Sequence, residues 1–202
     1  MKSVLVVVTL VAIAVSSGPS AVAAGSPATS GIYLNAADYS EHRLSFEGDC
    51  KSSIHKLELH DVLNKPYIHV THGTETKRYE KSDLFGFRSC EGLDYRFSGN
   101  HEYQILEAKQ LYIYVVQAPA RLGKDTAKDL NKVSTYYVSA GANGQVVPLT
   151  VNNLKQAFPD NHKFHDSLDQ MLGTGGELAQ FDDFHKMFKV NRLLIASTST
   201  DR

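Results

Sequence analysis

The spacing of apolar residues changes at Thr150, from a pattern typical of strands to one typical of helices. All 10 tyrosines precede this point, whereas five of the 9 phenylalanines follow it. A chain in which strands come first and helices last, without alternation, is typical of the α+β class. We therefore predict an α+β fold: an antiparallel β-meander curled into a barrel or sandwich, followed by three short C-terminal helices packed on it.

Short apolar or alternating segments predict a β-rich domain over residues 32–149. The segment Leu111 to Val116 is apolar or aromatic on both faces, which indicates a central strand. Ala142-Asn143-Gly144 predicts a hairpin, because Asn-Gly favours a type I′ turn with positive φ at both central residues. Other strands are predicted at residues 54–60, 67–72, 76–80, 84–88, 94–97, 102–106, 133–139 and 145–148.

Residues 150–195 are predicted to form a helical C-terminal segment, because three apolar stripes recur there at helical spacing. Pro159 ends the first helix, and Gly173 with Gly175-Gly176 separates the second from the third. Helices this short are unstable unless their stripe is buried, so we expect them to cover an open face of the strands. The alternatives are a small helical subdomain and a partner's groove. The stripes are Val151, Leu154 and Phe158; Phe164, Leu168 and Leu172; and Leu178, Phe181, Phe184 and Phe188.

Residues 1–24 are predicted to be a signal peptide. Lys2 precedes an apolar run from Val4 to Val15, and small residues at 21–24 provide a cleavage site. The run is too short to span a bilayer, which disfavours the alternative of a retained anchor helix. No later run of about 18 apolar residues occurs, so no transmembrane segment is expected after cleavage. We predict a periplasmic or secreted protein with a flexible start at residues 25–31 and a disordered tail at 196–202.

Cys50 and Cys90 are the two cysteines of the chain, and an exported protein meets oxidising conditions. We predict a disulfide between them; the alternative is two separate buried thiols. A loop of this span would restrict the unfolded chain by roughly 4 kcal/mol in the chain-entropy estimate. The pair is therefore expected to be structural.

The charge balance disfavours nucleic acid as a partner. Without Lys2, the chain carries 20 Lys and Arg against 22 Asp and Glu. Proteins that bind nucleic acids usually present a strongly basic face. We therefore expect no nucleic-acid partner.

Three histidines near the C-terminus form the candidate metal site. His162 and His165 are three residues apart on a predicted helix, and His185 lies on the next one. If these helices are antiparallel, the imidazoles converge with a carboxylate into a ligand set that zinc accepts. The alternative is that they are surface or capping residues, because no His-Glu-x-x-His spacing occurs. We expect no cofactor, with zinc as the candidate otherwise. The histidines of the strand region are interpreted as lying on solvated strand faces: His55, His60, His69 and His72.

Motifs for nucleophilic or phosphate chemistry are missing from the sequence. No Gly-x-Ser-x-Gly elbow occurs, and Gly173-Thr174-Gly175-Gly176 lacks the lysine of a P-loop. Carboxylates for glycoside hydrolysis can be paired in many ways, but their separation is not a property of the sequence. No catalytic residue is therefore assigned.

Tyrosines spread over the predicted strands are the remaining functional signal. An outward tyrosine ring offers an apolar face and a polar tip, which suits a carbohydrate, a peptide or a protein. Tyr67, Tyr95 and Tyr103 form the candidate binding surface. The alternative is that tyrosine, a good strand former, fills half-buried positions.

Three segments carry a resemblance. Asp83-Leu84-Phe85-Gly86-Phe87-Arg88, Gly92-Leu93-Asp94-Tyr95-Arg96-Phe97 and the later run from Ala157 to His165 resemble small exported bacterial proteins of unassigned function. The resemblance covers most of the chain after the signal and carries no catalytic motif. It implies a location and no chemistry.

These observations predict an exported, non-enzymatic protein that binds a ligand or a partner through an aromatic surface. One alternative is a small metal-assisted hydrolase, in which His162, His165 and His185 hold an ion that lowers the pKa of a water. Another is a structural or assembly protein that docks onto a partner through its C-terminal helices.

Overall fold

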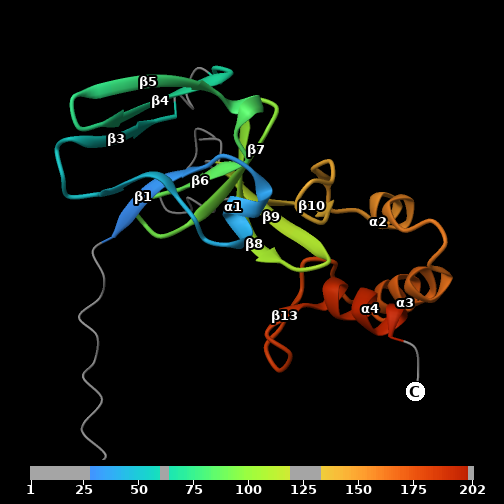
Figure 1. Cartoon of the computed structure of the whole chain (residues 1–202). Coiled ribbons are helices and arrows are strands. Elements are labelled where there is room, and N and C mark those ends of the chain that lie inside the picture. The colour runs from blue at the N-terminus through green and yellow to red at the C-terminus, as the bar shows by residue number, and fades with distance from the viewer. Residues whose placement is uncertain (1–27, 60–63, 119–132, 200–202) are drawn as a thin grey trace, which may run out of the picture.

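The computed structural model describes residues 28–59, 64–118 and 133–199 (Figure 1). Within these ranges the chain forms an eight-stranded sheet, a three-stranded sheet, a short two-stranded hairpin and four α-helices. The predicted signal peptide and His60 lie outside the described residues. No helix in the described part of the chain is long and apolar enough to cross a membrane.

The large sheet confirms the antiparallel β-rich, α+β prediction. Its strand order is β11-β10-β9-β8-β7-β6-β1-β2, so β6 to β11 follow one another as a meander and the β1–β2 pair is added beside β6. The sheet is open, with β2 and β11 at its edges, and the barrel alternative is therefore wrong. The strands are β1 (Thr29–Tyr33), β2 (Ser45–Asp49), β6 (Gly86–Arg88), β7 (Asp94–Ser98), β8 (His101–Ala108), β9 (Leu111–Ala118), β10 (Val133–Ala140) and β11 (Val147–Pro148).

A second, smaller sheet covers one end of the large one, which gives this end a sandwich-like layout. It consists of β3 (His55–Glu58), β4 (Tyr67–His72) and β5 (Glu75–Glu80), and a 3₁₀ turn at Lys81–Asp83 leads back to β6. Ile68 and Val70 of β4 pack against Ile32, Phe87 and Phe97 of the large sheet. We call this buried cluster the sheet-side core.

Three helices cover the other end of the large sheet: α2 (Val151–Ala157), α3 (His162–Gly173) and α4 (Lys189–Thr198). Leu154, Phe164 and Leu168 are fully buried there against Ile113 and Val138 of the sheet. We call this cluster the helix-side core. The apolar stripes of α2 and α3 thus pack inside the chain, as predicted, apart from Leu172, which is 39% exposed.

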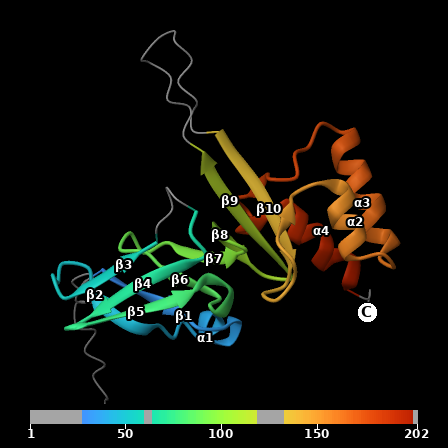
Figure 2. The ribbon, with the colours of Figure 1, turned by 90° about the horizontal axis from the view of Figure 1, so that it is seen from above.

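Both cores lie on the same face of the large sheet. Tyr95 of β7 is paired with Gln104 of β8, and Gln104 with Val115 of β9, so these three side chains share a face. Tyr95 packs against the sheet-side core, and Val115 shares its face with Ile113 of the helix-side core because side chains alternate along a strand. Figure 2 shows the small sheet and the helices at opposite ends of the large sheet. A strip of the sheet face is left between them.

The opposite face of the large sheet carries an aromatic cluster. Tyr33, Tyr112 and Tyr114 of the sheet pack there with Tyr39 of α1 (Ala36–Ser40). Tyr33 donates a hydrogen bond to Asp94, at 2.9 Å. Burial, followed by this contact with the carboxylate, raises the pKa of Tyr33. The cluster is therefore a core in which the tyrosine hydroxyls are neutral.

The predicted position of the third helix, over the stripe from Leu178 to Phe188, is wrong. The stripe from Leu178 to Phe188 instead includes a hairpin of β12 (Phe181–Asp182) and β13 (Met187–Phe188), and the third helix, α4, follows it. The Asp182 side chain accepts hydrogen bonds from the backbone N–H groups of Phe184 and His185, both at 3.1 Å. Such side-chain contacts offer the backbone an alternative to the helix.

Two predictions at chain ends also need correction. Thr29 to Gly31, within the segment predicted as flexible, belong to β1 and pair with β2 and β6. Residues 196–198, within the predicted disordered tail, form the last turn of α4. In both places, strand pairing or helix packing gives a regular structure to residues whose composition is typical of a loop.

The predicted hairpin at Asn143-Gly144 is confirmed, but its type I′ turn is wrong. The innermost pair joins Val138 to Val147, so the loop is longer than two residues, and the positive φ is at Gly141 instead. The Gly144 carbonyl accepts a hydrogen bond from Arg96, at 2.8 Å. A Cβ at Gly144 would lie 2.5 Å from the Ala140 carbonyl oxygen, so the loop folds back onto its own strand.

The disulfide between Cys50 and Cys90 is confirmed, with Cα atoms 5.6 Å apart. It joins the ends of β2 and β6, the two strands that flank β1. The bond therefore fastens the edge of the large sheet on the side of the small sheet.

Candidate functional site

A cleft of about 350 Å³ opens on the sheet face next to the small sheet. Its floor includes the cross-strand row Tyr95, Gln104 and Val115. Glu102 and Gln117 lie two residues along from this row and point to the same face. We call this hollow the sheet-face cleft. Its lining is Asn64, Tyr95, Asn100, His101, Glu102, Gln104, Val115, Val116 and Gln117.

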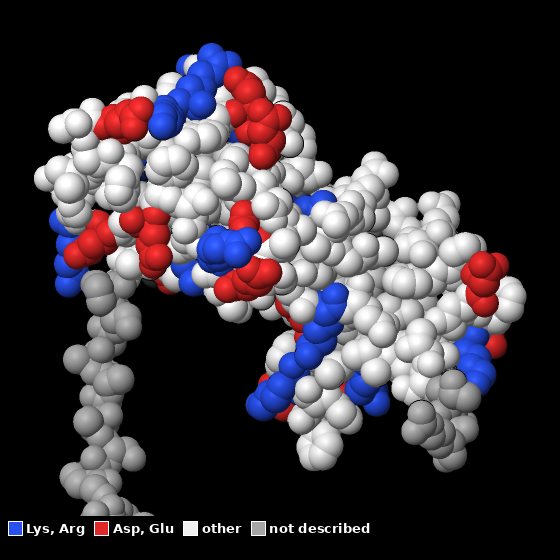
Figure 3. Space-filling view, in the orientation of Figure 1, with Lys and Arg blue, Asp and Glu red and all other residues white. Residues whose placement is uncertain are grey.

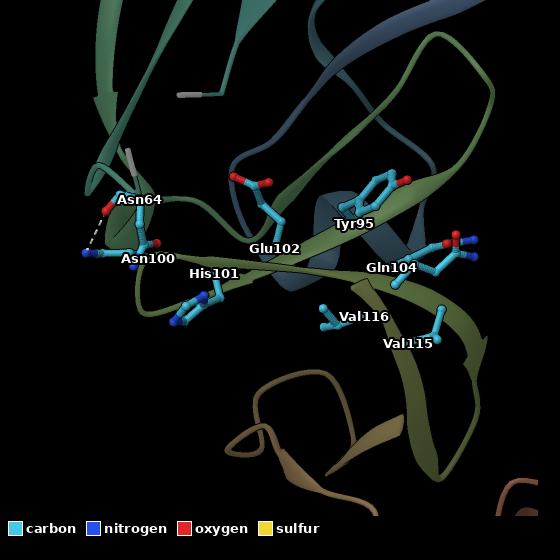
Figure 4. Close-up of a pocket in the computed structure, with 9 residues that line it drawn as sticks. Asn64, Tyr95, Asn100, His101, Glu102, Gln104, Val115 and Val116 are labelled. Atoms are coloured by element: carbon cyan, nitrogen blue, oxygen red, sulfur yellow. Dashed lines mark hydrogen bonds between the residues drawn. The ribbon is translucent and has the colours of Figure 1, made fainter. Parts of the chain in front are cut away.

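The Tyr95 ring is held in place by a buried ring beneath it. Its ring stacks on the Phe87 ring, with centroids 4.8 Å apart and planes within 4° of parallel. Phe87 itself is buried in the sheet-side core. The Tyr95 ring is therefore a fixed, half-buried platform, and Figure 4 shows it on the same side of the strands as Glu102.

The wall beside Glu102 is a connected polar network. Lys81, only 2% exposed, donates hydrogen bonds to Glu102 Oε1 at 2.6 Å and to the Asn100 carbonyl at 3.0 Å. The Asn100 amide in turn donates to the Asn64 carbonyl at 3.2 Å, as the dashed line in Figure 4 marks. A buried charge of this kind is tolerated when it is paired and hydrogen-bonded. The network fixes the carboxylate and neutralises it locally.

The chemistry of the cleft is polar but close to neutral. Four lining residues carry side-chain amides, each of which both donates and accepts hydrogen bonds. Glu102 is the one carboxylate in the described part of the lining, and the Lys81 ammonium balances its charge. Tyr95, Val115 and Val116 add apolar surface. Such a lining suits a ligand that donates and accepts in equal measure and also has an apolar face.

The three predicted binding tyrosines do not form one surface. Tyr95 lines the sheet-face cleft. Tyr67 lies on β4 with the Arg78 guanidinium 3.8 Å from its ring centroid, outside the lining of the cleft. Tyr103 lies on the opposite face, where its ring contacts Tyr137 and burial raises its pKa. Tyr95 is thus the one member of the three in the cleft.

The predicted metal ligands are likewise spread out. The His162 and His165 rings are neighbours, with centroids 5.8 Å apart, and His165 Nε2 lies 2.9 Å from the Phe158 carbonyl oxygen. His185 pairs instead with Asp182, at 2.9 Å. The described residues contain no group of three or more His, Cys, Asp or Glu side chains placed to hold a metal ion. The structure does not bring the three histidines together.

One histidine that the sequence placed on a solvated strand face is buried. His55 is 8% exposed, and its Nε2 lies 2.8 Å from the buried Ser30 hydroxyl. Its Nδ1 has no hydrogen-bond partner, and burial, followed by the neighbouring His72, lowers its pKa. A Cβ at Gly48 would lie 2.2 Å from this ring, so the absence of a side chain there makes room for it. The pair joins the small sheet to the large one.

Sequence analysis found Tyr95 but missed the rest of the cleft. Glu102 and Gln104 alternate with Tyr103 and Ile105 along β8, a pattern that ordinarily indicates a solvated strand face. Lys81 gave no signal, because a lysine after a strand is ordinarily exposed. Only the pairing of β7, β8 and β9 shows that these polar residues face one hollow.

Comparison of the chain with family models, curated proteins and solved structures found no match. The resemblance to small exported bacterial proteins stays a prediction.

Proposed function

We propose that this protein is an exported, non-enzymatic binding module whose sheet-face cleft takes a neutral, hydroxyl-rich ligand, of which carbohydrates are the common class. The observation that carries this proposal is the row of Tyr95, Gln104 and Val115 on the cleft floor. An aromatic ring packs against the C–H face of a sugar, and an amide satisfies hydroxyl groups, which both donate and accept.

The placement of the carboxylates supports binding over glycoside hydrolysis. Glycosidases usually need two carboxyl groups on either side of the bond they cleave. Among the residues that the structure describes, Glu102 is the one carboxylate in the lining of the cleft, and Lys81 holds it in an ion pair of 2.6 Å. A carboxylate fixed in this way accepts hydrogen bonds from a ligand without supplying a proton.

Export is supported by two independent features. The first 24 residues have the pattern of a signal peptide. The Cys50–Cys90 disulfide is of a kind that persists in oxidising compartments. We therefore propose that the protein works in the periplasm or outside the cell.

Calorimetric titration of the chain from residue 25 onward with a panel of neutral mono- and oligosaccharides tests the proposal. We expect at least one saccharide to bind, and Gln104→Ala to raise its Kd about tenfold, because a hydrogen-bonding group that the ligand covers is lost. Gln170→Ala, at an exposed site on α3, is the matched control and should leave Kd unchanged. The proposal fails if no saccharide binds, or if both variants weaken binding equally.

A further inference from the structure

The sheet-face cleft lies where two strands of the large sheet separate. β8 and β9 are paired as far as Gln104, which lies opposite Val115. Beyond this point, β8 continues beside β7 to His101, and β9 continues beside β10 through Gln117. In the described part of the chain, no strand pair joins these two continuations. Because residues of both continuations line the cleft, the hollow extends along β8.

The two ends of the cleft differ in chemistry. Figure 4 shows Tyr95 and Gln104 at one end and Asn64 and Asn100 at the other. Glu102 lies between them. The first end offers an aromatic platform beside one amide, and we call it the stacking end. The second end offers amides and backbone carbonyls, and we call it the polar end.

The cleft is longer than one sugar ring. Gln104 and His101 are three residues apart on β8, which corresponds to about 10 Å of extended strand. A sugar ring is similar in width to the tyrosine ring on which it stacks, so one ring covers the stacking end and leaves the polar end uncovered. Gln117 lies two residues beyond Val115, so its side chain is on the same face, in the row of Glu102. A second ring joined to the first therefore reaches these two polar side chains.

The surface charge favours a chain of neutral units. Figure 3 shows lysine and arginine side chains lying among aspartate and glutamate side chains, and neither sign forms a large patch among the described residues of this face. The whole chain carries 21 Lys and Arg against 22 Asp and Glu. An extended patch of one sign is the feature that attracts a highly charged polymer. A neutral oligosaccharide does not need such a patch.

We propose that the sheet-face cleft binds a linear, neutral oligosaccharide of at least two units, which lies along β8. One ring stacks on Tyr95, and the next occupies the polar end. There the Glu102 carboxylate, held by Lys81 at 2.6 Å, accepts hydrogen bonds from hydroxyl groups, and the Gln117 amide both donates and accepts them. This inference rests on the proposed function and adds the length and the direction of the ligand to it.

Calorimetric titration of the chain from residue 25 onward tests the length of the ligand. The probes are the mono-, di- and trisaccharides of glucose, mannose, galactose and N-acetylglucosamine. In a series that binds, we expect the Kd of the disaccharide to be about tenfold lower than that of the monosaccharide, because the second ring adds hydrogen bonds. Equal Kd values for the two lengths would overturn this inference and leave the proposed function standing. Failure of every sugar to bind would overturn both.

Single-site variants test the position of the second ring through the ratio of the monosaccharide Kd to the disaccharide Kd. Gln117→Ala should lower this ratio by about threefold or more, because an amide is lost from the polar end. Gln104→Ala, at the stacking end, should raise both Kd values and keep their ratio. Gln110→Ala, at an exposed site in the turn between β8 and β9, is the matched control and should change neither Kd. An unchanged ratio in Gln117→Ala would overturn the placement of the second ring.

Discussion

The two cores on the large sheet face are held by different kinds of interaction. The sheet-side core is bordered by a disulfide, by the Lys81–Glu102 ion pair and by the Ser30–His55 contact. The helix-side core consists of apolar side chains that meet Ile113 and Val138. The stability of the sheet-side core should therefore depend on redox state and pH. The stability of the helix-side core should depend on the volume of its side chains.

The helix-side core has one polar anchor, at Asn191. This fully buried amide accepts the N–H of Leu111 and donates to its carbonyl, both at 2.9 Å, and it also donates to Glu107. These contacts fasten α4 to the first residue of β9. The amide of Asn191 does not titrate, so its two hydrogen bonds to the Leu111 backbone do not depend on pH.

Truncation inside the helix-side core should have the largest effect on stability. Phe164 is fully buried at the centre of this core, so Phe164→Ala leaves a cavity. We expect it to lower the free energy of unfolding by about 3–5 kcal/mol. Urea unfolding followed by circular dichroism measures the change. Leu172→Ala, at an exposed site on the same helix, should cost less than about 1 kcal/mol. Equal losses in the two variants would contradict the assignment of the core.

Removing the disulfide should have the next largest effect, confined to the sheet side. The double substitution Cys50→Ser and Cys90→Ser frees a loop with a sequence separation of 40 residues. We expect a loss of about 2–4 kcal/mol in the free energy of unfolding. Hydrogen exchange should accelerate first in β2 and β6, while α3 keeps its protection in mild denaturant. Uniform acceleration in both regions would show instead that the two cores unfold as one unit.

The same contrast explains how far sequence analysis reached. Apolar segments such as Tyr67–His72 and Leu111–Val116 predicted strands correctly, because burial of one or both faces leaves a pattern in the chain. The stripe ending at Phe188 was misassigned, because Asp182 captures backbone groups that a helix would use. The spacing of apolar residues contains no information on such a contact.

The candidate site was less predictable than the fold. Tyr95 could be found from its residue type, but its neighbours in the cleft come from three strands whose register only the folded sheet defines. Lys81 is buried by its contact with Glu102, although lysine is ordinarily exposed, and His55, of a type intermediate in burial, is buried by its contact with Ser30. Polar residues buried in this way leave no periodic signal in the sequence.

Acid should produce the smallest effect, and it should act on the sheet side through His55. Burial lowers the pKa of His55 in the folded state, so the unfolded chain binds a proton more readily than the folded one. This group therefore leaves the free energy of unfolding unchanged above about pH 6.5, the ordinary pKa of histidine, and lowers it as the pH falls below that value.

The variant His55→Gln keeps a hydrogen-bonding group near Ser30 but does not titrate. We expect the urea midpoint of this variant to fall less between neutral pH and pH 5 than that of the native chain. Because His55 joins the two sheets, the extra loss in the native chain should coincide with faster hydrogen exchange in β3 and β4, and α3 should be spared. Identical pH dependence in the two proteins would remove His55 as the acid-sensitive contact and leave the carboxylates to account for any loss.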